Sequence, residues 1–203
     1  MFSRTENFSQ YIKFYPVVST LIALNVIIHL LSIVPVLGTV LFNYGAGVNY
    51  LISDGQWWRF ITPMFLHAGF LHLLFNMFSL YLFGPELEKL AGKVRFLTIY
   101  FMAGLFGTVA TFLLQDASYI HVGASGAIYG LLGAFGALVY YARKTLPQLR
   151  QIILPIIVIS IIMTFLTPNI NATAHLSGLA VGFLIGLSYF HPQRIISWKK
   201  RKR

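Results

Sequence analysis

GASGAIYG, at residues 123–130, and AHLSGLAVG, at residues 174–182, each open a long apolar segment of the chain. Ser125 lies in the first stretch and His175 in the second. Polar side chains inside membrane-spanning segments cost free energy, and they are usually retained for a function. A serine and a histidine together can turn a hydroxyl into a nucleophile. The two stretches therefore predict membrane helices that carry the side chains of a serine hydrolase.

The composition is typical of a membrane protein with several spans. Of the 203 residues, 57% are hydrophobic and only 10% are charged, and the mean hydropathy is +0.74, which is too apolar for a soluble domain of this length. The net charge of +10 is concentrated at the ends of apolar runs and forms no basic stripe with aromatic residues. We therefore expect no nucleic-acid partner. The absence of cysteine excludes disulfides and thiolate chemistry.

Six apolar segments are candidates for membrane-spanning helices, each of which needs about 20 residues. The fifth is short: Pro168 closes it, and Pro155 is expected near its start, where a missing N–H is tolerated. We expect an all-α, polytopic bundle of six transmembrane helices in one domain, 1–203, with an N-terminal segment 1–16 and a basic tail 191–203. The predicted spans are 17–37, 69–88, 94–114, 124–141, 151–167 and 172–190.

Lysine and arginine predict the orientation of these spans. Basic residues cluster on the cytoplasmic side of membrane proteins. In a six-span arrangement only Arg59 falls on the other side, whereas five or seven spans would scatter the charges. We therefore expect a cell-membrane protein with both termini in the cytoplasm. The residues on the cytoplasmic side would be Arg4, Lys13, Lys89, Lys93, Arg95, Arg143, Lys144, Arg150, Arg194 and the tail from Lys199 to Arg203.

The first external loop, residues 38–68, mixes aromatic and polar residues in a way that suits the membrane interface. It contains Trp57, Trp58, Phe60 and Phe65, with Arg59 among them. Either an aromatic-belt role or a more specific one would explain this loop, while Arg59 is expected to fix its conformation.

Polar side chains recur near the outer ends of the second, fourth and sixth predicted spans. His72 and Asn76 lie early in the second span and share one helix face, four residues apart. Ser125 opens the fourth, and His175 lies early in the sixth. At a rise of 1.5 Å per residue, all four fall roughly 5–10 Å below the outer surface. The shared depth predicts a single site.

Small residues could bring the fourth and sixth spans together. Gly178, Gly182 and Gly186 form a stripe at a spacing of four residues. Aligned small residues let membrane helices approach closely, and packing alone would account for them. Here close approach would also bring Ser125 within reach of His175. The residues around the serine are small too: Gly123, Ala124, Gly126, Ala127 and Gly130.

The sequence excludes two other mechanisms of intramembrane proteolysis. A paired-aspartate intramembrane protease needs two carboxylates within the membrane, and a zinc protease needs an H-E-x-x-H pattern; the sequence has neither. We therefore expect no metal and no cofactor, and a Ser–His dyad without a carboxylate. A proton-coupled transporter is disfavoured for the same reason. The acidic residues all fall in loops or at span ends: Glu6, Asp54, Glu86, Glu88 and Asp116.

These motifs resemble the rhomboid family of intramembrane serine proteases. Beside the two opening stretches, the matches are HAGFLHLLFN at 67–76, WWR at 57–59 and GPELEKLAG at 84–92. The resemblance covers essentially the whole chain, with the motifs in the family's order. The chain looks like the minimal six-span bacterial form.

The resemblance implies roles for the site residues. Ser125 would be the nucleophile and His175 the general base, while His72 and Asn76 would donate hydrogen bonds to the oxyanion. Tyr129 would pack against the imidazole of His175. Substrates would be membrane proteins whose transmembrane segments are cut near the outer end. The supporting residues would be Gly123, Gly126 and His67.

A non-catalytic member of the same fold that binds transmembrane clients is the alternative. The motifs name neither a physiological substrate nor an oligomeric state.

Overall fold

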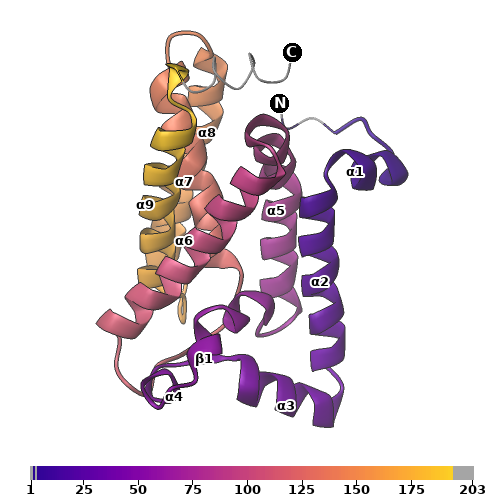
Figure 1. The fold of residues 1–203 in the computed structure, drawn as a ribbon, viewed down its shortest axis with the longest axis vertical. Coiled ribbons are helices and arrows are strands. Elements are labelled where there is room, and N and C mark those ends of the chain that lie inside the picture. Colours follow the sequence, from indigo (N-terminus) through magenta and orange to yellow (C-terminus); the bar gives the residue numbers. More distant parts are fainter. Residues whose placement is uncertain (1, 3, 194–203) are drawn as a thin grey trace.

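Six long helices dominate the structure, a computed structural model that describes residues 2 and 4–193 (Figure 1). They are α2 (Pro16–Ser32), α5 (Phe70–Ala91), α6 (Lys93–Leu114), α7 (Ser125–Ala142), α8 (Pro147–Leu166) and α9 (Ala172–Tyr189). Shorter elements connect them: α1 (Phe8–Phe14), α3 (Pro35–Gly45), β1 (Gly47–Val48), α4 (Asn49–Ser53), two 3-10 turns η1 (Trp57–Phe60) and η2 (Thr62–Phe65), and β2 (Ile120–His121).

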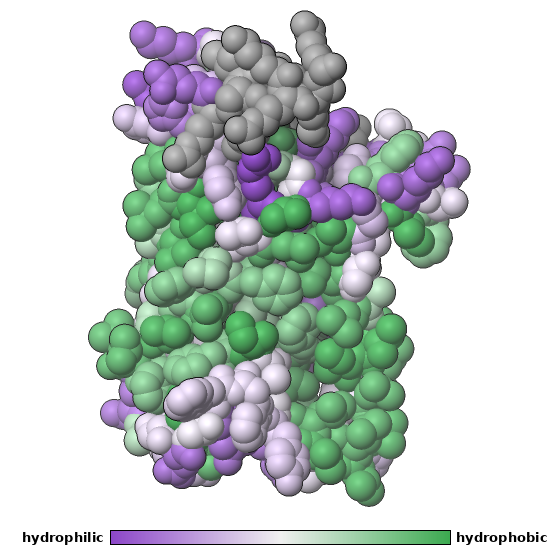
Figure 2. Space-filling model, in the orientation of Figure 1, coloured by the Kyte–Doolittle hydropathy of each residue, from purple (hydrophilic) through white to green (hydrophobic). Residues whose placement is uncertain are grey.

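The helices confirm the predicted membrane bundle. Among the described residues, α5 to α9 are each long and apolar enough to cross a membrane, and α1 with α2 passes the same test as a pair bent by 112°. Hydrophobic side chains cover the middle of the molecule, and hydrophilic ones gather toward its two ends (Figure 2). The chain is therefore an all-α, multi-pass membrane protein.

Two details of the predicted spans are wrong, and proline explains both. The span predicted at 17–37 ends early, because α2 stops at Ser32 and α3 begins at Pro35. Proline disfavours helical backbone in the residue before it, and Val34 is extended at φ −76°, ψ 120°. The fifth span starts earlier than predicted, with Pro147 in its first turn, so Pro155 lies inside α8 and not near its start. Interior proline is tolerated in membrane helices.

Close contact between α7 and α9 forms the centre of the bundle. A Cβ on Gly178 would overlap the carbonyl oxygen of Gly126, and a Cβ on Gly182 would overlap that of Gly130. The two backbones thus touch where both helices lack side chains, as expected for a small-residue stripe. This packing fixes the separation between the start of α7 and the start of α9.

The predicted basic clusters lie together at one end of the bundle. Figure 1 places α1, the junction between α5 and α6, and the loop between α7 and α8 at its upper end. A buried carboxylate organises this end, because Glu88 of α5 accepts hydrogen bonds from the N–H groups of Val17 and Val18, at 3.1 and 2.9 Å. These are orphan donors at the start of α2. The predicted basic tail from residue 194 onward lies outside the described residues.

The loop at the opposite end is rigidly held. Arg59 is buried, and its guanidinium donates to the carbonyls of Ala46 and Asn43 and to the side chain of Gln56. β1 pairs antiparallel with β2, with Gly47 opposite His121. Arg59 thus fixes the conformation of the loop, as predicted. The pairing of β1 with β2 joins this loop to the segment that precedes α7.

Candidate active site

Ser125 is the first residue of α7, reached through a turn that only glycine suits. Gly123 has φ +125°, and a Cβ there would lie 2.7 Å from the imidazole of His72. A side chain at this position would be strained and would displace that ring. The first N–H groups of a helix have no intrahelical partner, so α7 presents free donors and the positive end of its dipole beside the serine.

His175 lies in the first turn of α9, within hydrogen-bond distance of the serine. Its Nε2 is 2.8 Å from Ser125 Oγ, and the side chain is 5% exposed. The residue that caps α9 is Asn171, whose side chain accepts from the N–H of Ala174 and donates to the hydroxyl of Thr111 on α6. The helix that carries the histidine is therefore anchored one turn before it.

The other ring nitrogen of His175 contacts a residue that the sequence analysis missed. Thr164 Oγ1, on α8, lies 3.0 Å from Nδ1. The ring of Tyr129 stacks on the imidazole, with centroids 4.0 Å apart and planes at 18°. Its hydroxyl contacts both Thr164 Oγ1 and the carbonyl of Ser160 at 2.6 Å. The available signal for Thr164 was a hydroxyl residue inside the apolar run of α8, a feature that it shares with Ser160.

The two residues predicted to bind the oxyanion, His72 and Asn76, and the predicted supporting residue His67 have different surroundings. His72 lines the same cavity as Ser125 and His175. Asn76 is buried, and its side-chain amide donates to the carbonyl of His72 at 3.0 Å, which leaves its second N–H for another acceptor. His67 is 1% exposed and packs edge-on against the His72 ring, with centroids 5.0 Å apart. His67 therefore packs against His72 without lining the cavity itself.

A cavity of about 290 Å³ adjoins the serine, large enough for several water molecules. His121 of β2 and Asn171, the N-cap of α9, line it together with Ser125, His72 and His175. His121 was assigned no role from the sequence, and its ring lies against Gly47 of the paired strand. Burial lowers the pKa of His121 to about 4 and that of His67 to about 3, so both are neutral at pH 7.

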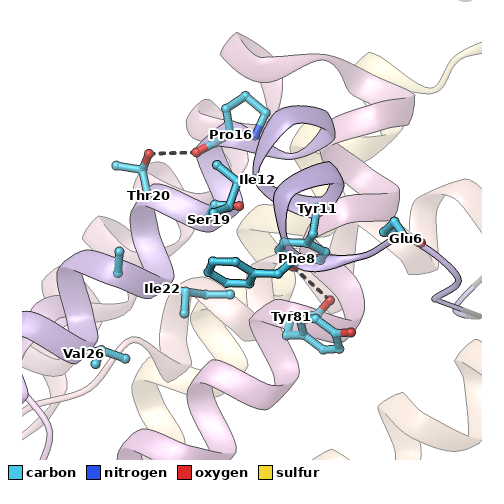
Figure 3. Close-up of a pocket in the computed structure, with 11 residues that line it drawn as sticks. Glu6, Phe8, Tyr11, Ile12, Pro16, Ser19, Thr20, Ile22, Val26 and Tyr81 are labelled. Carbon is cyan, nitrogen blue, oxygen red and sulfur yellow. Dashed lines mark hydrogen bonds between the residues drawn. The ribbon is translucent and has the colours of Figure 1, made fainter.

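A larger cavity of about 700 Å³ lies elsewhere, between α1, α2 and α5 (Figure 3). Its walls are mostly apolar, with Phe8, Ile22 and Val26 among them, and it includes none of the residues around Ser125. The polar groups that could support chemistry converge on the smaller cavity.

The comparisons with known proteins identify the family of the chain. The family model described as the rhomboid domain matches residues 54–192. The chain is 43% identical over 187 residues to "Putative rhomboid protease YdcA" of Bacillus subtilis (strain 168), covering 91% of this chain and 94% of that protein. The chain belongs to the rhomboid family.

Other rhomboid relatives match a smaller part. Rhomboid protease GluP of Bacillus subtilis (strain 168) is 41% identical over 144 residues, which is 70% of this chain but 28% of GluP. RHOMBOID-like protein 5 of Arabidopsis thaliana is 36% identical over 148 residues, or 70% of this chain and 47% of that protein. YdcA and GluP are both named as rhomboid proteases. The matched range includes Ser125, His175, His72, Asn76 and Thr164.

Proposed function

We propose that this rhomboid chain is an intramembrane serine protease that cuts transmembrane segments near the end of the bundle where Ser125 lies. The observation that carries the proposal is the 2.8 Å contact between Ser125 Oγ and His175 Nε2, inside an apolar bundle and beside a cavity. Such a contact is the geometric requirement for a base that activates a hydroxyl. The cavity would supply the water that hydrolysis consumes.

In the proposed reaction, His175 Nε2 accepts the proton of Ser125 while Oγ attacks the carbonyl carbon of the scissile peptide. The imidazolium then gives that proton to the leaving amine as the C–N bond breaks, which leaves an ester on Ser125. A water molecule loses a proton to Nε2 and attacks the ester. The acid product leaves, and the proton returns to the serine oxygen.

We assign Thr164 as a positioning residue in this cycle. Nε2 can accept the serine proton only when Nδ1 carries the hydrogen of the neutral ring. Nδ1–H would then donate to Thr164 Oγ1, 3.0 Å away, and the threonine hydroxyl would donate to the carbonyl of Ser160, at 2.9 Å. Stacking on Tyr129 limits rotation of the ring. These neutral contacts would perform the orienting task of a triad aspartate.

The oxyanion would lie between the start of α7 and the side chains of α5. The backbone N–H of Ser125 is a free donor at the helix N-terminus, and the His72 imidazole lies in the same cavity. The second N–H of Asn76 is the third candidate. Each donor of this kind typically contributes about 2.7–4 kcal/mol in the transition state.

The location of the site determines the class of substrate. Ser125 and His175 lie in the first turns of their helices, so the scissile bond would lie near one membrane surface. Attack needs an accessible carbonyl, which a stable helix hides. We therefore assign single transmembrane segments with helix-breaking residues near their outer end as substrates. We also place the basic end of the bundle in the cytoplasm, following the positive-inside rule.

The decisive experiment combines purified protein with a model single-span substrate. Ser125→Ala should abolish cleavage without changing the thermal unfolding temperature, because alanine fits a contact already made by small residues. Ser79→Ala on α5, outside the cavity, is the matched control and should retain full activity. Cleavage by Ser125→Ala would refute the proposed nucleophile. Client binding that survives without any cleavage by the wild type would favour the non-catalytic alternative.

A further inference from the structure

A separate groove runs along the bundle from Arg143 and Arg150 at the basic end to Leu176 near the start of α9. It has a volume of about 600 Å³ and lies between α7, α8 and α9. Its walls are mostly apolar, and this volume falls within the range of about 300–1,000 Å³ that is usual for small-molecule sites. The residues that form the walls include Gly136, Tyr140, Leu154, Ile157, Ala180 and Phe183.

The groove exists because α8 is anchored only near its two ends. Of the five spanning helices, α8 is the least buried. Its buried residues are Leu149 and Ile153 near the start and Thr164 near the end. Between these anchors α8 packs incompletely against α7 and α9, and Gly136 puts no side chain into the gap.

Two arginines line the groove at the basic end of the bundle. Arg143 follows the last residue of α7, Arg150 lies in the first turn of α8, and both line the groove. Within residues 2 and 4–193 neither has a carboxylate at ion-pair distance. Arg143 donates to the carbonyl of Tyr140, and its guanidinium lies 4.9 Å from the centre of that ring. The pair thus presents two unneutralised charges at the end of an apolar channel.

We propose that this groove binds one anionic phospholipid, with the phosphate between Arg143 and Arg150 and an acyl chain along α8. Charge complementarity selects the anion, since guanidinium groups bind phosphate oxygens in a forked geometry. The apolar walls select an acyl chain, which a free phosphate lacks. The bound chain would fill the gap that α8 leaves against its neighbours.

Such a lipid would act on the catalytic pair through α8. Leu176 lines the groove and is the next residue after His175. Thr164, the second anchor of α8, contacts the imidazole itself. An occupied groove would hold α8 in place and preserve that contact. This regulatory consequence rests on the proposed function, whereas the binding itself does not.

Native mass spectrometry of the purified protein tests the binding, with phosphatidylglycerol and phosphatidylcholine of identical acyl chains as probes. Arg143→Gln with Arg150→Gln should weaken phosphatidylglycerol binding about 30-fold, since each interfacial cation contributes roughly a factor of five. Lys89→Gln with Lys93→Gln removes two charges from the same end but outside the groove, and should leave binding unchanged. Equal losses in the two double variants, or equal affinity for the two lipids, would overturn the proposal.

A third variant tests the acyl chain separately. Ala180 is exposed in the groove wall, so Ala180→Leu should fill the space and weaken phosphatidylglycerol binding without any change in charge. Inorganic phosphate should compete poorly. Strong competition by phosphate, with unchanged lipid binding in Ala180→Leu, would refute the acyl-chain site. All binding is measured in Ser125→Ala protein whose thermal unfolding matches that of the wild type, so a failure of the proposed catalysis would not affect the result.

Discussion

The two ring nitrogens of His175 contact two different helices. Nε2 is 2.8 Å from Ser125 on α7, and Nδ1 is 3.0 Å from Thr164 on α8. In the proposed mechanism, the first contact transfers a proton, whereas the second sets the orientation and tautomer of the ring. Substitutions on the two sides should therefore have different kinetic consequences.

Thr164→Val removes the hydroxyl and keeps the volume of the side chain. We expect kcat to fall about tenfold with little change in KM, because the loss of a hydrogen bond worth about 1.4 kcal/mol in the transition state corresponds to that factor. Thr164→Ser restores the hydroxyl and should restore most of kcat. If both variants instead lose activity only in proportion to their loss of thermal stability, Thr164 is a packing residue.

Acidification should reduce cleavage, because the imidazolium form of His175 cannot accept the proton of Ser125. The rate at which a fluorophosphonate labels the protein, measured between pH 8 and pH 5, reports this step directly. Labelling should require both Ser125 and His175 and should recover when the pH is raised again. A labelling rate independent of pH, or one retained by His175→Ala, would show that the histidine is not the activating base.

At the scale of helices, α7 and α9 depend on their glycine contacts. Gly182→Ala would place a Cβ against the carbonyl of Gly130, whereas Gly136→Ala makes only ordinary contacts with Phe183 and Ile157. Overpacking typically costs about 1–3 kcal/mol, so Gly182→Ala should lower the unfolding temperature by roughly 2–12 °C. Gly136→Ala is the matched control, measured in the same detergent, and should unfold within a degree or two of the wild type. Equal unfolding temperatures of the two variants would mean that α7 and α9 can move apart at no cost in stability.

The helices also show what the sequence could predict. Apolar runs and the positions of lysine and arginine predicted six spans and their orientation, because charged and polar groups are costly to bury in lipid. Polar side chains are also costly inside membrane spans, and on this ground Ser125, His72 and His175 were predicted to form one site. The break before Pro35 was missed because apolar residues continue through it. Thr164 was missed because its partner, His175, is brought to it only by the packing of α8.

For the whole molecule, acid should also weaken the fold. Burial lowers the pKa of His67 to about 3 and that of His121 to about 4, whereas both titrate near 6.5 in an unfolded chain. Between these values the unfolded chain binds more protons, so the free energy of unfolding falls as the pH falls from about 6.5 toward 4. Thermal unfolding of Ser125→Ala in detergent at pH 7.5 and pH 5 measures the effect. His67→Gln should reduce the difference between the two pH values, and an unchanged difference would contradict this origin.

The contact between Ser125 and His175 joins residues 50 positions apart in the chain. A ribosome adds roughly 5–20 residues per second, so the histidine is made about 3–10 s after the serine. In the proposed mechanism, the nascent protein would hold its nucleophile without His175 throughout that interval. A polypeptide that stalls or is degraded before its last helix would therefore lack the proposed catalytic pair. The order of the two residues along the chain would thus delay the proposed activity until the last helix has been made.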